Sequence, residues 1–262
     1  MDGTPPFLFL AGLHRSGTTL LHRLLRDHPQ VSGFENTGVK MDEGQFLQTV
    51  YPPGNRFGGP GRFALDPAAH MDESHPLATE ENARRLLAQW RPYLDLSRRW
   101  LLEKSPPNLI RTRFLQALFP DSRFLVILRH PLAVAYATRK WCPDPIPSLV
   151  EHNLAAYERF LADAPALNDY RVIRYETFVT DPQSHLDALW RWLELPPIPS
   201  TRTVEPHINQ AYFEQWRRER RRWWRLRSWA WLERLEPRAN RLGYSLLTPE
   251  ALKPLPDVLE TI

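Results

Sequence analysis

The stretch FLFLAGLHRSGTTLLHRLL, residues 7–25, joins an apolar run to a glycine-containing loop and a patterned amphipathic segment. Phe7–Ala11 is short and continuously apolar, as expected of a strand that is buried on both faces of a sheet. In Thr18–Arg26, leucines at positions 20, 21, 24 and 25 have helical spacing. The stretch therefore predicts a strand, a tight loop and a helix, which together form a nucleotide-binding βα unit.

The loop, residues 12–19, has the spacing of the triphosphate motif G-x-x-x-x-G-K-[ST], except that Thr18 replaces the lysine. Backbone N–H groups at a helix N-terminus, with the hydroxyls of Ser16, Thr18 and Thr19, form a cradle for an anion. The lysine of such a loop reaches the β- and γ-phosphates, so its loss argues against triphosphate hydrolysis. Arg15 offers a planar fork that suits a single phosphate or sulfonate group.

Composition sets limits on the class of protein. The 262 residues are 42% hydrophobic, which is enough for a substantial core, and the net charge of +4 favours anionic partners. The single cysteine, Cys142, excludes an internal disulfide and a cysteine-cluster metal site, and we expect no bound metal. We find no basic leader and no apolar run of about 18 residues, so we expect a cytoplasmic protein without a membrane span.

Strand and helix patterns alternate along the chain. Further strands are predicted at 31–34, 100–103, 123–128 and 170–174. Helices are predicted at 80–96, 107–118, 131–141, 148–162, 182–193 and 213–242. This alternation predicts an α/β, three-layer, P-loop-like fold with a mostly parallel central sheet and helices on both faces.

We expect the chain to be divided into a core, residues 1–195, and a C-terminal extension. Residues 41–76 are rich in glycine, proline and aromatic residues, and we expect an irregular excursion over the site there. Residues 196–262 hold a proline-rich linker and a helical extension rich in tryptophan and arginine, expected to pack on the core.

Five segments, in order, resemble sulfotransferases that use 3′-phosphoadenosine 5′-phosphosulfate (PAPS) as donor. GLHRSGTTLL resembles their 5′-phosphosulfate loop, which lacks the triphosphate lysine. HPQVSGFENTGV and EKSPPNLIR resemble segments of the tyrosylprotein and heparan-type enzymes. RFLVILRHP resembles the strand that ends at the 3′-phosphate, and VIRYETFVTDP resembles the late segment beside the nucleotide. Together these segments cover roughly residues 7–195.

The resemblance implies a role for each matched position. Glu35 would be the catalytic base, and Lys104 would lie by the transferred group. Arg129 would bind the 3′-phosphate, and Tyr175 would adjoin the nucleotide. The 5′ side of the donor would be held by the loop residues His14, Arg15, Ser16, Gly17, Thr18 and Thr19. Arg15 would also stabilise the leaving phosphate together with Lys104, Thr18 and Thr19.

One position departs from the family pattern. A serine usually follows the phosphate-binding arginine by eight residues and also bonds the 3′-phosphate. Here that position is Ala137, with Thr138 next. Thr138 would take over the contact after a small helix shift; otherwise the 3′-phosphate loses one partner.

The sequence therefore favours a PAPS-dependent sulfotransferase that acts on a hydroxyl of a small-molecule or glycan acceptor and releases 3′-phosphoadenosine 5′-phosphate. We expect the acceptor pocket to be built from residues 41–100, whose composition suits an alcohol, a sugar or a glycolipid. Two alternatives stay open: a P-loop nucleotide-dependent kinase, and a non-catalytic protein that binds anions or membrane surfaces.

Residues 212–235, YFEQWRRERRRWWRLRSWAWLERL, carry five tryptophans and eight arginines. At helical spacing these residues form an aromatic stripe beside a basic face. Three interpretations compete: the tryptophans pack on the core while water surrounds the arginines, the arginines close over the donor, or the basic run 217–227 touches an acidic membrane surface. No recognised nucleic-acid motif is present, and we expect no nucleic-acid partner.

Overall fold

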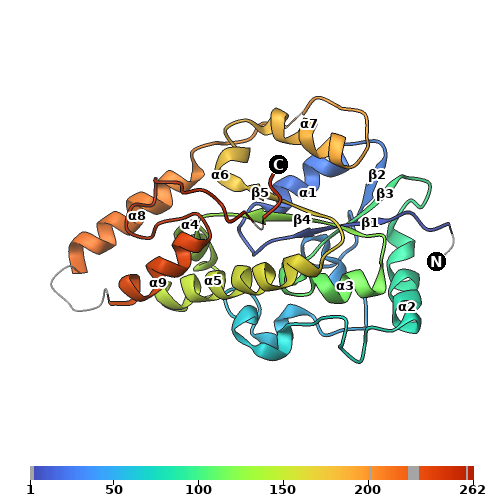
Figure 1. The fold of residues 1–262 in the computed structure, drawn as a ribbon, viewed down its shortest axis with the longest axis horizontal. Helices are drawn as coiled ribbons and strands as arrows, with labels where there is room; N and C mark the ends of the chain where they lie inside the picture. Colours follow the sequence, from blue (N-terminus) through green and yellow to red (C-terminus); the bar gives the residue numbers. More distant parts are fainter. Residues whose placement is uncertain (1–2, 201, 224–229, 258) are drawn as a thin grey trace.

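The computed structural model describes residues 3–200, 202–223, 230–257 and 259–262. A parallel sheet forms its centre, with strands in the order β2-β3-β1-β4-β5 (Figure 1). The strands are β1 (Phe7–Ala11), β2 (Val31–Gly33), β3 (Trp100–Lys104), β4 (Arg123–Leu128) and β5 (Tyr170–Arg174). Because the pairings are parallel, the carboxyl ends of the strands lie along one edge of the sheet.

Helices connect and cover the strands. They are α1 (Thr18–Arg26), α2 (Glu80–Trp90), α3 (Thr112–Leu118), α4 (Pro131–Thr138), α5 (Ile146–Asp163), α6 (Tyr175–Phe178), α7 (Pro182–Trp192), α8 (Ile208–Trp223) and α9 (Ala230–Arg241). Helices α1, α6 and α7 lie over one face of the sheet, and α3, α5 and α9 lie over the other (Figure 1). The predicted three-layer α/β class is confirmed.

The strands β1, β3, β4 and β5 each contribute to two separate cores because their side chains alternate between the faces of the sheet. In β1, Leu8 and Leu10 pack with α1 and α7, whereas Phe7 and Phe9 pack with α2, α3 and α5. All five β1 residues are buried, as the continuous apolar run predicts. The two cores fix β1 in the middle of the sheet, so the loop that follows it opens at the carboxyl edge.

Several predicted helices are shorter than their patterns. The helix predicted to reach residue 96 ends at Trp90, and a 3₁₀ turn follows at Arg91–Tyr93. The helix predicted at 107–118 is divided into a 3₁₀ segment, Pro106–Ile110, and α3. Proline accounts for both changes, because Pro92, Pro106 and Pro107 lack the N–H group that an α-helical ladder needs.

The segment expected to be an irregular excursion, residues 41–76, has short 3₁₀ turns and no α-helix or strand. The turns are Lys40–Asp42, Gly44–Phe46, Gly54–Phe57, Phe63–Leu65 and Pro67–Ala69. Tyr51, Phe63 and Met71 are buried in the same core as α5. Part of this segment therefore packs into the core on the same face of the sheet as α5.

The C-terminal extension packs on the core. On α8, Phe213 and Trp216 are buried, and the rings of Trp216 and Trp231 are in edge contact with their centroids 5.9 Å apart. The chain end then runs beside β5, where the Val172 N–H donates to the Glu260 carbonyl over 2.8 Å. No helix of the described residues is both long enough and apolar enough to cross a membrane.

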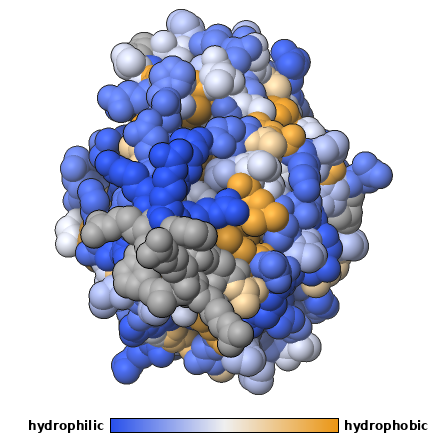
Figure 2. Space-filling model, turned by 90° about the vertical axis from the view of Figure 1, so that its left-hand side faces the viewer, coloured by the Kyte–Doolittle hydropathy of each residue, from blue (hydrophilic) through white to orange (hydrophobic). Residues whose placement is uncertain are grey.

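The described arginines of α8, Arg217, Arg218, Arg220 and Arg221, are exposed. Figure 2 looks at the end of the molecule where α8 and α9 approach each other, and it shows a mainly hydrophilic face with a smaller apolar area. The burial of Trp216 and the exposure of these arginines fit the interpretation in which the tryptophans of residues 212–235 pack on the core. The side chains of residues 222–229, with three of its five tryptophans, lie outside the described residues.

Candidate active site

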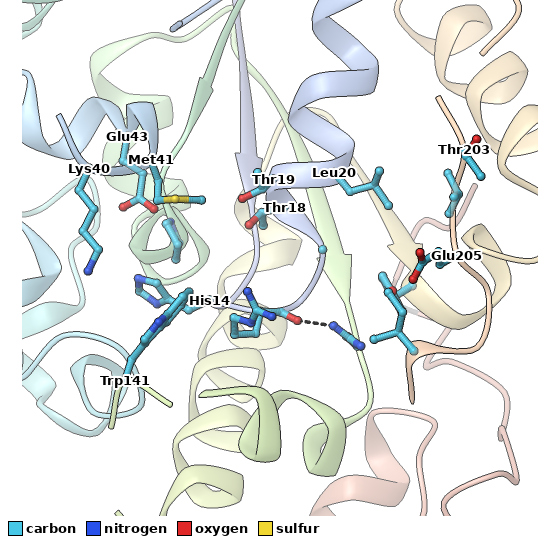
Figure 3. Close-up of a pocket in the computed structure, with 17 residues that line it drawn as sticks. His14, Thr18, Thr19, Leu20, Lys40, Met41, Glu43, Trp141, Thr203 and Glu205 are labelled. Carbon is cyan, nitrogen blue, oxygen red and sulfur yellow. Dashed lines mark hydrogen bonds between the residues drawn. The ribbon is translucent and has the colours of Figure 1, made fainter. Parts of the chain in front are cut away.

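A cleft of about 350 Å³ opens at the carboxyl edge of the sheet. Its walls come from the loop after β1, the start of α6 and the chain just before α8. Figure 3 shows Thr18 and Thr19 in the middle, with His14, Lys40, Met41, Glu43 and Trp141 on one side and Thr203 and Glu205 on the other. We call these the Glu43 side and the Glu205 side. The cleft lies where parallel α/β sheets bind their ligands.

The loop after β1 presents unsatisfied backbone donors to this cleft. Gly17 begins α1 in the left-handed region, with φ of 107°, and no side chain caps the helix. The first N–H groups of a helix have no intrahelical acceptor, so they are available to an anion. A Cβ at Gly17 would lie 2.8 Å from the Tyr175 ring, so only glycine fits beneath that ring. This geometry supports the predicted anion cradle.

The loop side chains divide between lining the cleft and shaping the loop. His14, Arg15, Gly17, Thr18 and Thr19 line the cleft. Ser16 does not line it: its hydroxyl donates to the Leu13 carbonyl over 2.7 Å and closes the turn. Burial lowers the pKa of His14 to about 3, so this imidazole is neutral near pH 7.

Arg129 follows β4 and lies at the floor of the cleft, 5% exposed. Its Nη1 donates to the Arg15 carbonyl over 2.6 Å, which is the dashed line in Figure 3. Its guanidinium carbon lies 4.1 Å from the centre of the Tyr175 ring. The predicted residues Arg15, Arg129 and Tyr175 are therefore brought together around one cavity.

Lys104 ends β3 and meets a carboxylate that sequence reasoning missed. Its Nζ lies 3.4 Å from Oε1 of Glu43 and donates to the Met41 carbonyl over 2.9 Å. The two side chains are 2% and 5% exposed. Burial raises the pKa of Glu43 above its usual range, although nearby Lys104 opposes that shift. Glu43 is thus a shielded carboxylate that lines the cleft and is held beside a cation.

A second buried carboxylate, Glu103, holds the backbone beside Glu43. Its Oε1 accepts from the Gly44 N–H over 2.9 Å and from the Ser105 hydroxyl over 2.6 Å, and its Oε2 accepts from the Asn108 amide. A Cβ on Gly44 would lie only 2.6 Å from Glu103 Oε1. Burial raises the pKa of Glu103 to about 7. This network places the turn that carries Glu43 against the end of β3.

Besides Ser16 and Lys104, which lie behind the lining residues, three predicted site residues do not line the cleft. The Glu35 side chain is 56% exposed and forms an ion pair with Arg26. Ala137 is buried in α4, and Thr138 faces a small cavity that it shares with His14. The structure therefore does not bring Glu35 to Lys104.

The Glu43 side has an aromatic and apolar surface. Trp141 is 47% exposed, and Met41 is also exposed. The guanidinium carbon of Arg15 and the Nζ of Lys40 lie 5.1 and 5.8 Å from the centre of the Trp141 ring. Met41 and Asp42 both have positive φ, which turns the chain sharply just before Glu43. Of the expected acceptor region 41–100, Met41 and Glu43 line the cleft.

The residues that sequence reasoning missed on the Glu43 side share one local signal. Lys40, Asp42 and Glu43 cluster their charges just before a glycine, Gly44. That cluster indicates a polar turn, but the local sequence does not predict that the turn contacts the end of β3. On the Glu205 side, residues 203–205 carry no such signal.

A family model described as "Sulfotransferase family" matches residues 6–200, about three quarters of the chain. The chain belongs to the sulfotransferase family. The matched residues include the loop after β1, Lys104, Arg129 and Tyr175, so the cleft is largely built from the family region. Family membership favours the sulfotransferase interpretation over the nucleotide-dependent kinase.

Among curated relatives, this sulfotransferase family member is 30% identical over 139 residues to protein-tyrosine sulfotransferase 2 of Gallus gallus, covering 52% of this chain and 34% of that protein. It is 26% identical over 227 residues to nodulation protein NoeE of Sinorhizobium fredii, covering 71% of this chain and 49% of that protein. The chain thus spans between a third and a half of these relatives. A solved structure of a sulfotransferase from Alicyclobacillus acidocaldarius is 20% identical, with a TM-score of 0.48, and the match covers 90% of this chain and 96% of that chain.

Proposed function

We propose that this chain binds PAPS in the cleft and transfers its sulfuryl group to a hydroxyl of an acceptor. One observation carries the proposal: two separate anion-binding groups face the same cavity. The uncapped start of α1 offers backbone donors, and Arg129 offers guanidinium donors beside Tyr175. A donor with phosphate at both its 5′ and 3′ positions suits such a pair, with the 5′ side on the loop and the 3′-phosphate at Arg129.

We assign the base to Glu43 rather than Glu35, because Glu43 lines the cleft and Glu35 does not. The acceptor oxygen attacks sulfur while its proton passes to the Glu43 carboxylate. The new O–S bond replaces the bond from sulfur to the 5′-phosphate oxygen, and 3′-phosphoadenosine 5′-phosphate leaves. A base with a raised pKa is better matched to neutral pH than an ordinary carboxylate.

The growing charge on the leaving phosphate is stabilised by the loop. Arg15, Thr18 and Thr19 line the cleft beside the N-terminus of α1, and their donors need no rearrangement at the moment of transfer. Lys104 keeps Glu43 oriented and adds positive charge close to the reacting group. Positioning and electrostatics supply most of the rate, as in phosphoryl transfer.

The acceptor enters on the Glu43 side. The exposed ring of Trp141 and the side chain of Met41 form an apolar surface next to the proposed base. A ring-bearing alcohol or a sugar presents a flat face that can stack on an indole. The hydroxyl to be sulfated would then lie between this surface and the donor.

The test is calorimetric titration of the chain with 3′-phosphoadenosine 5′-phosphate, adenosine 5′-phosphate and ATP with magnesium. We expect the bisphosphate to bind at least tenfold more tightly than adenosine 5′-phosphate, because only it reaches Arg129. Preferential binding and turnover of ATP would instead support a kinase. Tight binding of the bisphosphate, with no sulfate transfer from PAPS to any of a panel of alcohols and sugars, would support the non-catalytic alternative.

A further inference from the structure

Arg129 is held by a residue from the C-terminal extension. Its Nε and Nη2 both donate to Oδ1 of Asn209, over 2.8 and 2.6 Å. Asn209 lies near the start of α8 and is 8% exposed. The two residues are 80 positions apart in the chain, and Asn209 lies outside the region 6–200 that matches the family.

This contact decides which donors Arg129 can offer. A guanidinium has five N–H bonds. Three are taken by Asn209 and by the Arg15 carbonyl, which leaves one on Nη1 and one on Nη2. The Tyr175 ring supports the guanidinium from one face. The remaining pair of donors is therefore fixed in direction before any ligand arrives, and such preorganisation lowers the entropic cost of binding.

Asn209 is itself oriented by a carboxylate. Its Nδ2 donates to Glu176 Oε1 over 2.7 Å, which leaves its Oδ1 to face the guanidinium. Glu176 also accepts from the His130 N–H over 2.9 Å and from the Tyr244 hydroxyl over 2.7 Å. The chemistry of both neighbours requires this orientation of the amide, because a guanidinium only donates and a carboxylate only accepts.

We propose that Asn209 is a positioning residue for anion recognition, and that the C-terminal extension thereby completes the 3′-phosphate site of the donor. The inference rests on the proposed function. Asn209 acts through Arg129 and does not itself touch the donor phosphate. Residues 203–205 and Ile208 also line the cleft, so the segment that carries Asn209 helps to shape the cavity.

The test compares Asn209→Ala with Gln210→Ala in the full chain. Gln210 is the adjacent residue; it is exposed, and its one side-chain hydrogen bond among the described residues goes to Glu214. For each variant we would titrate 3′-phosphoadenosine 5′-phosphate and adenosine 5′-phosphate. We would then divide the dissociation constant of adenosine 5′-phosphate by that of the bisphosphate, so that a larger ratio means a stronger preference for the 3′-phosphate. We expect Asn209→Ala to reduce that ratio about tenfold and Gln210→Ala to leave it unchanged.

A second variant covers the case in which Asn209→Ala fails to fold. Asn209→Asp keeps an acceptor for Arg129, but it places a negative charge beside Glu176 and beside the incoming phosphate, so we expect an equal or larger loss of the ratio. An unchanged ratio in the folded variants would overturn the positioning role. A wild-type chain that binds both nucleotides equally would overturn the proposed donor and this inference together.

Discussion

Lys104 Nζ lies 3.4 Å from Glu43 Oε1, and both side chains are almost completely withdrawn from water. A buried ion pair is often a net cost to stability, because desolvation offsets much of the attraction. Such a pair at the wall of a cleft is therefore better explained by chemistry than by folding. In the proposed reaction, this pair would supply a base and a cation where the acceptor meets the donor.

We predict that Glu43→Gln reduces kcat for sulfate transfer by at least 100-fold and leaves the affinity for 3′-phosphoadenosine 5′-phosphate nearly unchanged. The amide keeps the shape of the side chain but cannot accept the proton. In the wild type, we expect kcat to fall as the pH drops through the Glu43 pKa, because only the ionised carboxylate is a base. Burial raises that pKa, so this fall occurs above the range of an ordinary carboxylate.

Glu35→Gln is the matched control. The Glu35 side chain is largely exposed and forms an ion pair with Arg26 rather than with a group in the cleft. We expect kcat to change by less than about threefold, because Glu35 does not line the cleft and a surface substitution changes a free energy by roughly 0.5 kcal/mol or less. A severe loss in Glu35→Gln with full activity in Glu43→Gln would reverse the assignment of the base.

We predict that Glu103 makes folding stability depend on pH. Burial raises its pKa from 4.5 to about 7, so between these values the folded chain binds more protons than the unfolded chain. Stability therefore falls as the pH rises across this window, by about 3 kcal/mol for this group. Denaturant unfolding at several pH values should show that the free energy of unfolding changes less with pH in Glu103→Gln than in the wild type. The same pH dependence of the unfolding free energy in the variant and the wild type would exclude Glu103 as its source.

Trp141 is predicted to select the acceptor. Trp141→Ala should raise the KM for phenol about fivefold, since aromatic contacts contribute about 1 kcal/mol, and should have less effect with cyclohexanol. The affinity for 3′-phosphoadenosine 5′-phosphate should stay within about twofold of the wild type. Tyr93 is exposed outside the cleft, so Tyr93→Ala is the control. Equal KM changes in both variants would argue against a specific role for Trp141.

Contact of α8 with an acidic membrane stays a prediction. Arg218 and Arg221 are exposed and have no carboxylate partner among the described residues. If α8 binds membranes, reversing both charges to glutamate should weaken sedimentation with phosphatidylserine vesicles at least tenfold. Binding should also fall with salt, and Arg84→Glu on α2 should have little effect. Sedimentation that is insensitive to salt and to both reversals would remove α8 as a membrane contact.

The βα units could be predicted from sequence because their signals are local. The apolar run Phe7–Ala11, the two loop glycines and the helical spacing of Thr18–Arg26 lie within twenty residues. A short continuous apolar run is typical of a strand buried on both faces, and the structure has that strand with the same bounds. The same reasoning placed Arg129 at the carboxyl edge, since it directly follows the run Arg123–Leu128.

Tertiary structure decided which carboxylate reaches the cleft. Glu35 and Glu43 are eight residues apart, and both follow the first βα unit. The choice depends on Lys104 and Glu103, which lie about sixty positions later and hold the Glu43 turn by buried contacts. The partnership of Arg129 and Asn209 spans 80 positions. Local patterns determine elements, whereas such distant pairs meet only when the sheet closes and the helices pack over it.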